Sequence, residues 1–264
     1  MPRVDPHRVA TAGLLSFAVL SLDAQNTSLE PGRSPCALDD GITPYADLRE
    51  ADVAWERRVW RMVDLRDPSN RLFNSPSSEL AQCLDLFGVI RHGLLNEEAI
   101  TAYDPGPLAS DDTFRTPFAG SGIRAIIAAL DTVPENRVGR YVLKEDWIFD
   151  KQRSVMEVRI IGLAPMVGVL GEDGELRGYR TLFWLYYPEC RQLFSRWAAA
   201  QGADERPVSY EALFALRRFA STIIKVSNVF DRAINEHKTT LDALMESGTV
   251  REQVIHLGFD LWNY

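Results

Sequence analysis

The sequence predicts an α+β fold, in which a central antiparallel β-meander over about residues 140–187 is flanked by helices from the N-terminal and C-terminal parts. Three observations predict it. Apolar residues recur at helical spacing before residue 140 and after residue 208. Between these parts, apolar and polar residues alternate in short runs that are separated by tight turns. No repeat of 20–50 residues is visible, which argues against a solenoid or propeller.

The first 24 residues have the organisation of a secretory signal peptide. Arg3 and Arg8 give a positive start, residues 10–22 are uncharged and mostly apolar, and a small residue precedes the expected cleavage position. The apolar run is shorter than the about 20 residues that span a bilayer, and a buried N-terminal helix is the alternative. No later apolar stretch is long enough to span a membrane, so the mature chain is expected to be soluble. Residues 25–45, rich in Asn, Ser, Pro, Gly and Asp, are predicted to form an extended arm with little regular structure. Folding of this arm onto a partner and plain disorder are the two alternatives.

Residues 46–264 are then expected to form a single α+β domain, which begins with a helix over residues 46–64. Val53 and Trp60 fall on roughly the opposite face from the main apolar stripe of this helix. That stripe consists of Leu48, Ala51, Trp55, Val59 and Met62. A helix with two apolar faces is either enclosed in a core or shared with a second molecule.

Two further helices precede the meander in the prediction. One covers about residues 78–96, and a short extended piece follows over residues 100–103. For the other helix, Thr116 is the expected N-cap and Pro117 the first helical position, although two glycines weaken its start.

Four short runs make up the predicted meander. Residues 141–149 and 155–161 alternate across a polar turn and indicate a hairpin. Residues 166–170 form a third run before a Gly-Glu-Asp-Gly turn, and residues 181–187 form a fourth that stops before a proline. Tight connections of this kind favour antiparallel pairing.

After the meander, Ser209 is predicted to cap a helix that continues to about Glu236. Residues 240–264 are interpreted as a terminal helix or helix pair. The aromatic residues at the very end imply that this segment docks on the core or on a neighbouring molecule.

The acidic composition argues against one class of function. The net charge is −8, whereas a dedicated nucleic-acid binder normally carries a basic patch.

The three cysteines, Cys36, Cys83 and Cys190, fit no CxxC motif. We expect buried free thiols, with one disulfide as the alternative for an exported chain.

The sequence contains no convincing catalytic constellation. Its histidines lack the spacing of a zinc site, and no nucleophile elbow, Walker loop or dinucleotide-binding fingerprint is present. Glu145 and Asp146 are the acidic candidates, but adjacent strand residues point to opposite faces and cannot share a cleft directly. We expect both to be salt-bridged beside Lys144, Arg153 and Arg159.

Five segments from about residue 46 to the end together resemble the GldN/PorN family, a periplasmic component of the type IX secretion and gliding machinery of Bacteroidetes. They are residues 49–66 (READVAWERRVWRMVDLR), 141–162 (YVLKEDWIFDKQRSVMEVRIIG), 182–190 (LFWLYYPEC), 225–232 (KVSNVFDR) and 259–264 (FDLWNY). The order and spacing of the segments also agree with the family.

The resemblance implies a non-enzymatic role without a cofactor. It implies binding to an outer-membrane lipoprotein (PorK/GldK-like) and assembly with it, and with further copies of the chain, into a periplasmic ring. That ring would meet the periplasmic part of an inner-membrane motor subunit (PorM/GldM-like). The expected location is therefore the periplasm, in association with the outer membrane through the lipoprotein.

Aromatic residues near charges are the candidates for protein interfaces, because such residues anchor interfaces. The candidates are Val53, Trp55, Trp60, Trp147, Tyr186, Tyr187, Trp262 and Tyr264. Two rival functions predict different features. A cell-wall hydrolase needs convergent carboxylates or a Ser/His pair, and a small-ligand-binding module needs a deep apolar pocket in a monomer.

Overall fold

The computed structural model describes residues 36, 38, 41–74, 83–132, 137–199 and 207–227. The predicted signal peptide, residues 25–35 of the arm and the predicted helices of residues 240–264 lie outside the described residues. The described elements are η1 (Glu50–Asp52), β1 (Val53–Asp64), η2 (Pro68–Phe73), α1 (Leu86–Leu95), β2 (Ala102–Tyr103), α2 (Gly120–Thr132), β3 (Val138–Asp150), β4 (Val155–Leu170), β5 (Leu176–Thr181), β6 (Trp184–Tyr186), α3 (Tyr187–Ser195), β7 (Ala198–Ala199), β8 (Val208–Ser209), α4 (Tyr210–Ala215) and β9 (Thr222–Val226). Within this part of the chain, none of the helices is long and apolar enough to cross a membrane.

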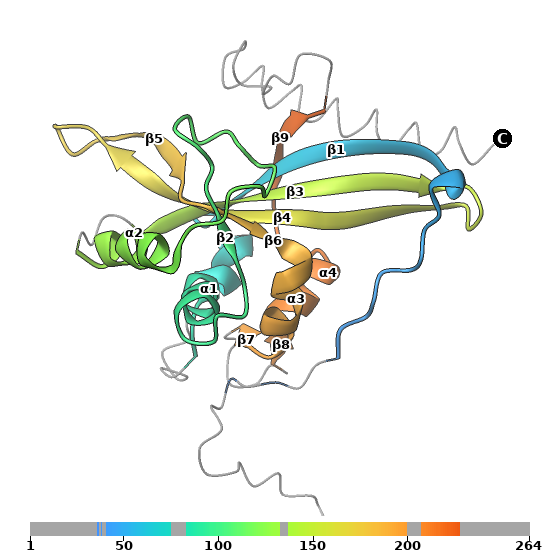
Figure 1. Ribbon diagram of the computed structural model, residues 1–264, viewed down its shortest axis with the longest axis horizontal. Coiled ribbons are helices and arrows are strands. Elements are labelled where there is room, and N and C mark those ends of the chain that lie inside the picture. The colour runs from blue at the N-terminus through green and yellow to red at the C-terminus, as the bar shows by residue number, and fades with distance from the viewer. Residues whose placement is uncertain are drawn as a thin grey trace, which may run out of the picture. The chain divides into compact units, whose positions relative to one another are not determined.

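Seven strands form the main sheet, in the order β2-β6-β4-β3-β1-β9, and β5 also pairs with β4 (Figure 1). Every pairing in this sheet is antiparallel. Helices α1, α3 and α4 lie together on one face of it (Figure 1). The predicted α+β class is therefore confirmed.

The prediction of a helix over residues 46–64 is wrong, because residues 53–64 form β1. This strand lies between β3 and β9 and is paired with both. Val59 and Val63 are buried on one face and Trp60 on the other. Because β1 has apolar residues on both faces, some of them happen to fall at helical spacing. Its valines and tryptophans nevertheless favour a strand when β3 and β9 pair with it on both sides.

The meander is confirmed in part. β3 and β4 form the predicted hairpin, but β4 is one strand of 16 residues rather than two separate runs. The apolar residues 162–165 between the runs are buried on β4, so no break is needed there. The fourth run is also shorter than predicted, since Tyr187 begins α3 and Pro188 lies in its first turn, a position that proline favours.

The helix boundaries differ from the predicted ones. α1 starts only at Leu86, where the side chain of Asp85 accepts a hydrogen bond from the N–H of Gly88 (2.7 Å). α2 starts at Gly120, because Pro117 is used instead in a β-bridge with Tyr103. Ser209 caps α4 as predicted (3.1 Å to the N–H of Ala212).

The predicted continuation of α4 to Glu236 is wrong. The helix ends at Ala215, and Arg217 adopts a left-handed conformation (φ 53°). Residues 222–226 then form β9, where Ile223 and Val226 are buried beside Val59 of β1. Pairing with β1 thus outweighs the helical spacing of this segment.

Two apolar clusters lie on opposite faces of the sheet. The larger one fills the space between the sheet and the helices and includes the buried aromatic residues Phe183, Phe194 and Phe214. The smaller one joins Trp60 to Trp184, and Phe114 from the loop between β2 and α2 packs against it. The middle of the sheet is therefore covered by apolar side chains on both faces.

Cys36 and Cys83 form a disulfide, so the prediction of free thiols is wrong for these two residues. It is confirmed for Cys190, which is a free, fully buried thiol whose pKa burial raises. Next to the disulfide, the N–H of Leu38 donates to Arg196 (2.9 Å) and the N–H of Ala198 donates to Cys36 (2.8 Å). The arm is thereby attached to the segment that follows α3.

Replacing Cys36 and Cys83 together by serine is expected to lower the free energy of unfolding by about 2–4 kcal/mol, because the disulfide closes a long loop in the unfolded chain. Urea denaturation followed by circular dichroism measures this loss. Cys190→Ser is the control for the exchange of a buried sulfur outside the disulfide. A double variant as stable as the parent would contradict a stabilising disulfide.

Asp64, at the end of β1, is expected to make an acid-sensitive contribution to the stability of the fold. Hydrogen bonds from Arg66, together with the charge of Arg140, lower the pKa of Asp64 from 3.8 to about 2. A lowered pKa stabilises the fold above about pH 4, and this stabilisation is lost as the pH falls through about 2. We expect the urea midpoint of the parent to fall more steeply between pH 4 and 2 than that of Asp64→Asn. Asp47→Asn, at an exposed position, should retain the parent's slope.

Candidate protein-interaction site

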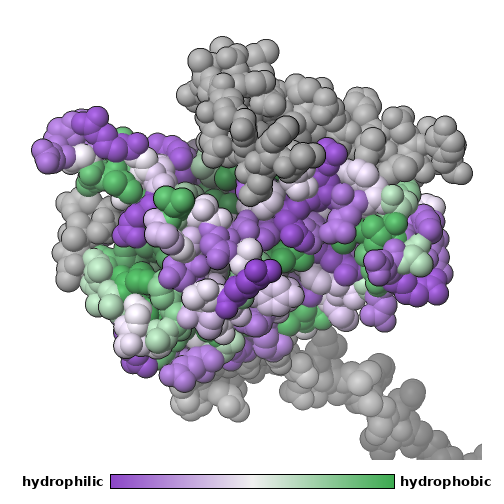
Figure 2. Space-filling model, turned by 45° about the horizontal axis from the view of Figure 1, so that its top comes forward, coloured by the Kyte–Doolittle hydropathy of each residue, from purple (hydrophilic) through white to green (hydrophobic). Residues whose placement is uncertain are grey.

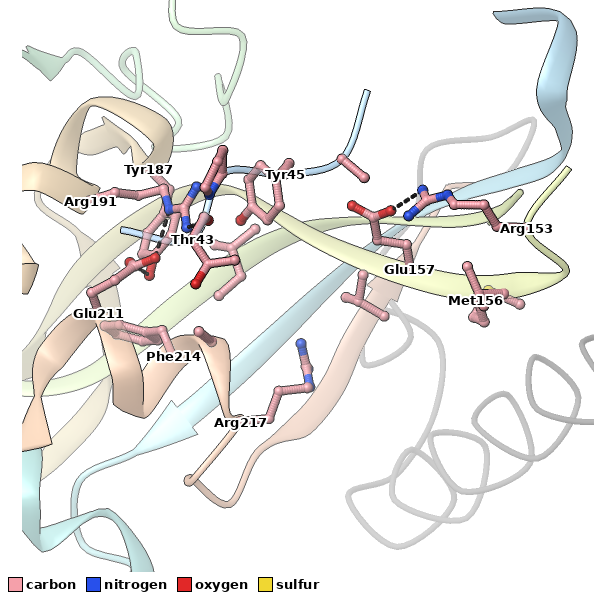
Figure 3. Close-up of a pocket in the computed structure, with 16 residues that line it drawn as sticks. Thr43, Tyr45, Arg153, Met156, Glu157, Tyr187, Arg191, Glu211, Phe214 and Arg217 are labelled. Atoms are coloured by element: carbon pink, nitrogen blue, oxygen red, sulfur yellow. Dashed lines mark hydrogen bonds and ion pairs between the residues drawn. The ribbon is translucent and has the colours of Figure 1, made fainter. Parts of the chain in front are cut away.

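A groove of about 340 Å³ lies where the N-terminal half of β4 passes helices α3 and α4 (Figure 3). We call it the edge groove. Residues 41–46, called the strap, run in extended conformation past it and supply one wall. The lining residues are Thr43, Pro44, Tyr45, Ala46, Arg153, Val155, Met156, Glu157, Val158, Ile160, Tyr187, Arg191, Glu211, Phe214, Ala215 and Arg217.

The edge groove runs beside an open strand edge. β4 pairs with β3 on one side from Val155 onwards. On its other side it pairs with β6 at Gly162 and Leu163 and with β5 from Met166. Between residues 155 and 161, no strand of the described chain pairs with this side. Such an edge presents free N–H and C=O groups to which another strand can add.

A buried ion pair forms the inner end of the edge groove. Glu211, 5% exposed, accepts hydrogen bonds from Nε of Arg191 (2.6 Å) and from the hydroxyl of Tyr187 (2.7 Å). The cap at Ser209 places Glu211 in the first turn of α4, opposite α3. Burial and the neighbouring Glu211 carboxylate raise the pKa of Tyr187 well above its ordinary value, so this phenol remains a hydrogen-bond donor.

The strap is held by arginines from α3 and β4. Nη2 of Arg191 donates to the carbonyl of Thr43, and Nη2 of Arg159 donates to the carbonyl of Ala46, both at 2.6 Å. The ring of Tyr45 lies 4.4 Å from the Arg191 guanidinium carbon and 5.2 Å from that of Arg159. The Tyr45 hydroxyl also hydrogen-bonds to the backbone of Ile160. The strap therefore covers β4 near Ile160 and leaves residues 155–158 open.

The rim of the edge groove carries paired charges. Arg153 donates to Asp150 (2.6 Å) and to Glu157 (2.7 Å), and Arg159 donates to Glu157 (2.7 Å). Burial alone would raise the pKa of Glu157, but these two arginines outweigh it and lower the pKa. At the opposite wall, Arg217 donates to Glu145 (2.8 Å). Paired charges around apolar side chains suit recognition of an extended polypeptide.

The two acidic candidates are separated as predicted. Glu145 is fully buried on the helix side of the sheet, where it also accepts a hydrogen bond from Nε1 of Trp147 (2.9 Å). Asp146 accepts two hydrogen bonds from Arg58 on β1 (2.6 and 2.8 Å). The prediction that both carboxylates are salt-bridged is confirmed, but their partners are Arg217 and Arg58 rather than Lys144, Arg153 and Arg159. Within the described residues, there is no group of three or more His, Cys, Asp or Glu side chains that could hold a metal ion.

The predicted interface residues do not form one surface. Trp60 is 7% exposed, and its indole N–H donates to Asp112 in the loop before α2 (2.6 Å). Tyr187 is buried and is the one candidate that lines the edge groove, whereas Tyr186 is exposed and stacks edge-on against Phe114 (5.6 Å between ring centroids). Three candidates are half-buried: Val53 and Trp55 at the start of β1, and Trp147 in the C-terminal half of β3. The last two candidates, Trp262 and Tyr264, lie outside the described residues.

The chain matches the family described as "Gliding motility associated protein GldN" over residues 48–263. It belongs to the GldN family. A comparison with curated protein sequences gives no match. The GldN match includes β4, α3 and α4, whereas the strap lies just before it. The predicted family is therefore confirmed, and the chain is a gliding-motility-associated protein.

Sequence reasoning missed most residues of the edge groove in this GldN-family chain. In the sequence, Arg153 and Glu157 look like ordinary charged residues of the predicted hairpin. Tyr45 lies in the predicted arm, which has no periodic pattern of apolar residues. The one available signal was the alternation of Glu157 and Arg159 with apolar residues, which indicates a strand with a solvent-facing side. That signal does not reveal that one side of the strand lacks a partner over residues 155–161.

Proposed function

We propose that this chain is a non-enzymatic structural component of the type IX protein secretion machinery. In this proposal it forms a periplasmic ring with an outer-membrane lipoprotein (PorK/GldK-like) and contacts the inner-membrane motor complex (PorM/GldM-like). The observation that carries the proposal is the GldN-family match over residues 48–263. The signal-peptide pattern of residues 1–24 supports export to the periplasm.

The geometry of the edge groove supports a binding role. The charged groups at its rim and inner end are paired with one another, while its floor is formed by apolar side chains such as Met156 and Val158. Open strand edges bind proteins through main-chain hydrogen bonds, and neighbouring pockets select the side chains. A ring subunit needs such surfaces, because each copy must contact neighbours through unlike patches.

Native mass measurement tests the proposal. The mature chain is purified alone and after co-expression with the neighbouring lipoprotein, and both samples are analysed by light scattering and native mass spectrometry. We expect an assembly of many copies that contains both chains. A monomer in both samples would contradict the proposed function. Loss of residues 1–24 from the periplasmic protein, read by intact mass, tests the localisation independently.

A further inference from the structure

The end of the β4–β5 hairpin leaves the sheet as a two-stranded ribbon. β3 pairs with β4 only as far as Val167. Beyond this point, residues 168–170 pair with residues 176–179 of β5 alone. We call residues 168–179 the ribbon, and Figure 1 shows it projecting at the left. A two-stranded hairpin by itself is at most marginally stable in water, so such a ribbon is stabilised when a third strand covers it.

The ribbon exposes apolar side chains that a partner would bury. Val169, Leu170 and Leu176 are 40%, 41% and 44% exposed, and they are three of the seven exposed large hydrophobic residues in the described chain. Leu176 packs across Gly168, where a Cβ atom would lie 2.9 Å from Cδ1 of Leu176. In Figure 2 the lobe that projects at the upper left is hydrophilic at its tip, and apolar surface is visible below the tip, toward the body of the molecule.

The tip of the ribbon is acidic. Glu172, Asp173 and Glu175 form the turn, and Gly174 supplies the positive φ (+78°) that the turn requires. Arg177 pairs with Asp173 and is the one basic residue of the ribbon. The lining of the edge groove contains three arginines and two glutamates, and each of the three arginines is already paired with a carboxylate.

The ribbon and the edge groove occupy opposite ends of one strand. The ribbon begins at Gly168 and the open edge ends at residue 161, so the facing ends of the two surfaces are about 23 Å apart at 3.3 Å per residue. Both lie on the same side of β4, where β5 and β6 pair. Two unlike surfaces at opposite ends of a subunit make head-to-tail contacts, which close into rings or continue as filaments.

We propose that the ribbon of one copy adds to the open edge of β4 in the next copy. Leu176 and its apolar neighbours then pack against Val155, Met156 and Val158, and the acidic turn lies beside Arg153. Main-chain hydrogen bonds extend the sheet from one subunit into the next. This inference rests on the proposed ring, for which it names the contact between copies.

Paired cysteine variants test the contact. Leu176→Cys and Val155→Cys change exposed side chains, so both variants should fold. The native cysteines do not interfere, because Cys36 and Cys83 are bonded and Cys190 is buried. The two variants are mixed under mild oxidation with the lipoprotein present and separated on a non-reducing gel. We expect a cross-linked dimer in the mixture and in neither variant alone.

Leu108→Cys provides the matched control, because Leu108 is 86% exposed and belongs to neither surface. Mixed with Val155→Cys, it should give at least tenfold less dimer. A disulfide dimer of Leu176→Cys alone would show symmetric ribbon pairing and overturn the proposal. Large native assemblies without a cross-link in the mixture would overturn it and leave the proposed function intact. A monomer without any cross-link would contradict both.

Charge reversal gives a second test that does not depend on oxidation. Glu172→Lys with Glu175→Lys should weaken association of the chain with itself at least tenfold while the circular dichroism spectrum stays unchanged. Combination with Arg153→Glu in the partner copy should restore part of the loss. Unchanged association of the ribbon variant would contradict the proposed contact.

Discussion

Replacing Glu211 by alanine is expected to lower the free energy of unfolding by about 3–5 kcal/mol, the usual cost of breaking a buried ion pair. Glu211 is 5% exposed, and its carboxylate accepts hydrogen bonds from Arg191 and Tyr187. Without this carboxylate, the buried Arg191 side chain loses its ion pair and the buried phenol of Tyr187 loses its hydrogen-bond acceptor. The strap is weakened as well, because Arg191 also holds the carbonyl of Thr43.

Urea denaturation measures the effect, and Glu189→Ala is the matched control. Glu189 lies on α3 as an exposed carboxylate and should change stability by less than about 0.5 kcal/mol. Glu211→Gln keeps a hydrogen-bond acceptor without the charge and should fall between the parent and the alanine variant. A loss below about 1 kcal/mol for Glu211→Ala would show that the ion pair does not stabilise the fold.

Trp60→Ala is the second large effect, with an expected loss of about 3–5 kcal/mol from a buried aromatic side chain. Trp60 belongs to the apolar cluster with Val142, Ala164 and Trp184. Its indole N–H donates to Asp112, and the Lys225 ammonium lies 4.4 Å from its ring. The truncation leaves a cavity on the sheet and removes one of the two partners of the Asp112 carboxylate, which keeps its ion pair with Lys144 (3.0 Å).

Thermal and urea unfolding test this prediction against Trp55→Ala, a half-buried tryptophan on the same strand, for which about 1 kcal/mol is expected. Trp60→Phe keeps the ring but not the N–H and should be intermediate. Equal losses for the two tryptophans would contradict the packing argument. Reduced assembly of Trp60→Ala must therefore be compared with its stability before Trp60 is assigned to an interface.

The sequence was sufficient to predict the β3–β4 hairpin and the α+β class. Alternation over residues 141–149 and 155–161 is specific, because only a strand separates neighbouring side chains onto two faces. The same alternation placed Glu145 and Asp146 on opposite faces. The caps at Asp85 and Ser209 involve local hydrogen bonds, and Ser209 was recognised for that reason.

β1 was misjudged because its burial is decided by distant partners. Trp55, Val59 and Met62 fit a helical stripe as well as they fit a strand with two covered faces, and only the presence of β3 and β9 distinguishes these cases. The edge groove was unpredictable for a related reason. It brings together residues from Thr43 to Arg217, and its central property, an unpaired edge of β4, exists only in the complete sheet order.

The position of β1 also determines how late the sheet can be completed during folding. Its hydrogen bonds with the end of β9 join Arg58 to Ser227, which are 169 positions apart. Folding rates fall as native contacts become more distant in the chain, because closing a long loop costs entropy before the contact forms. The edge of β1 that receives β9 therefore remains uncovered until almost the whole described domain is available, and this exposed edge is the expected starting point for aggregation of unfinished chains.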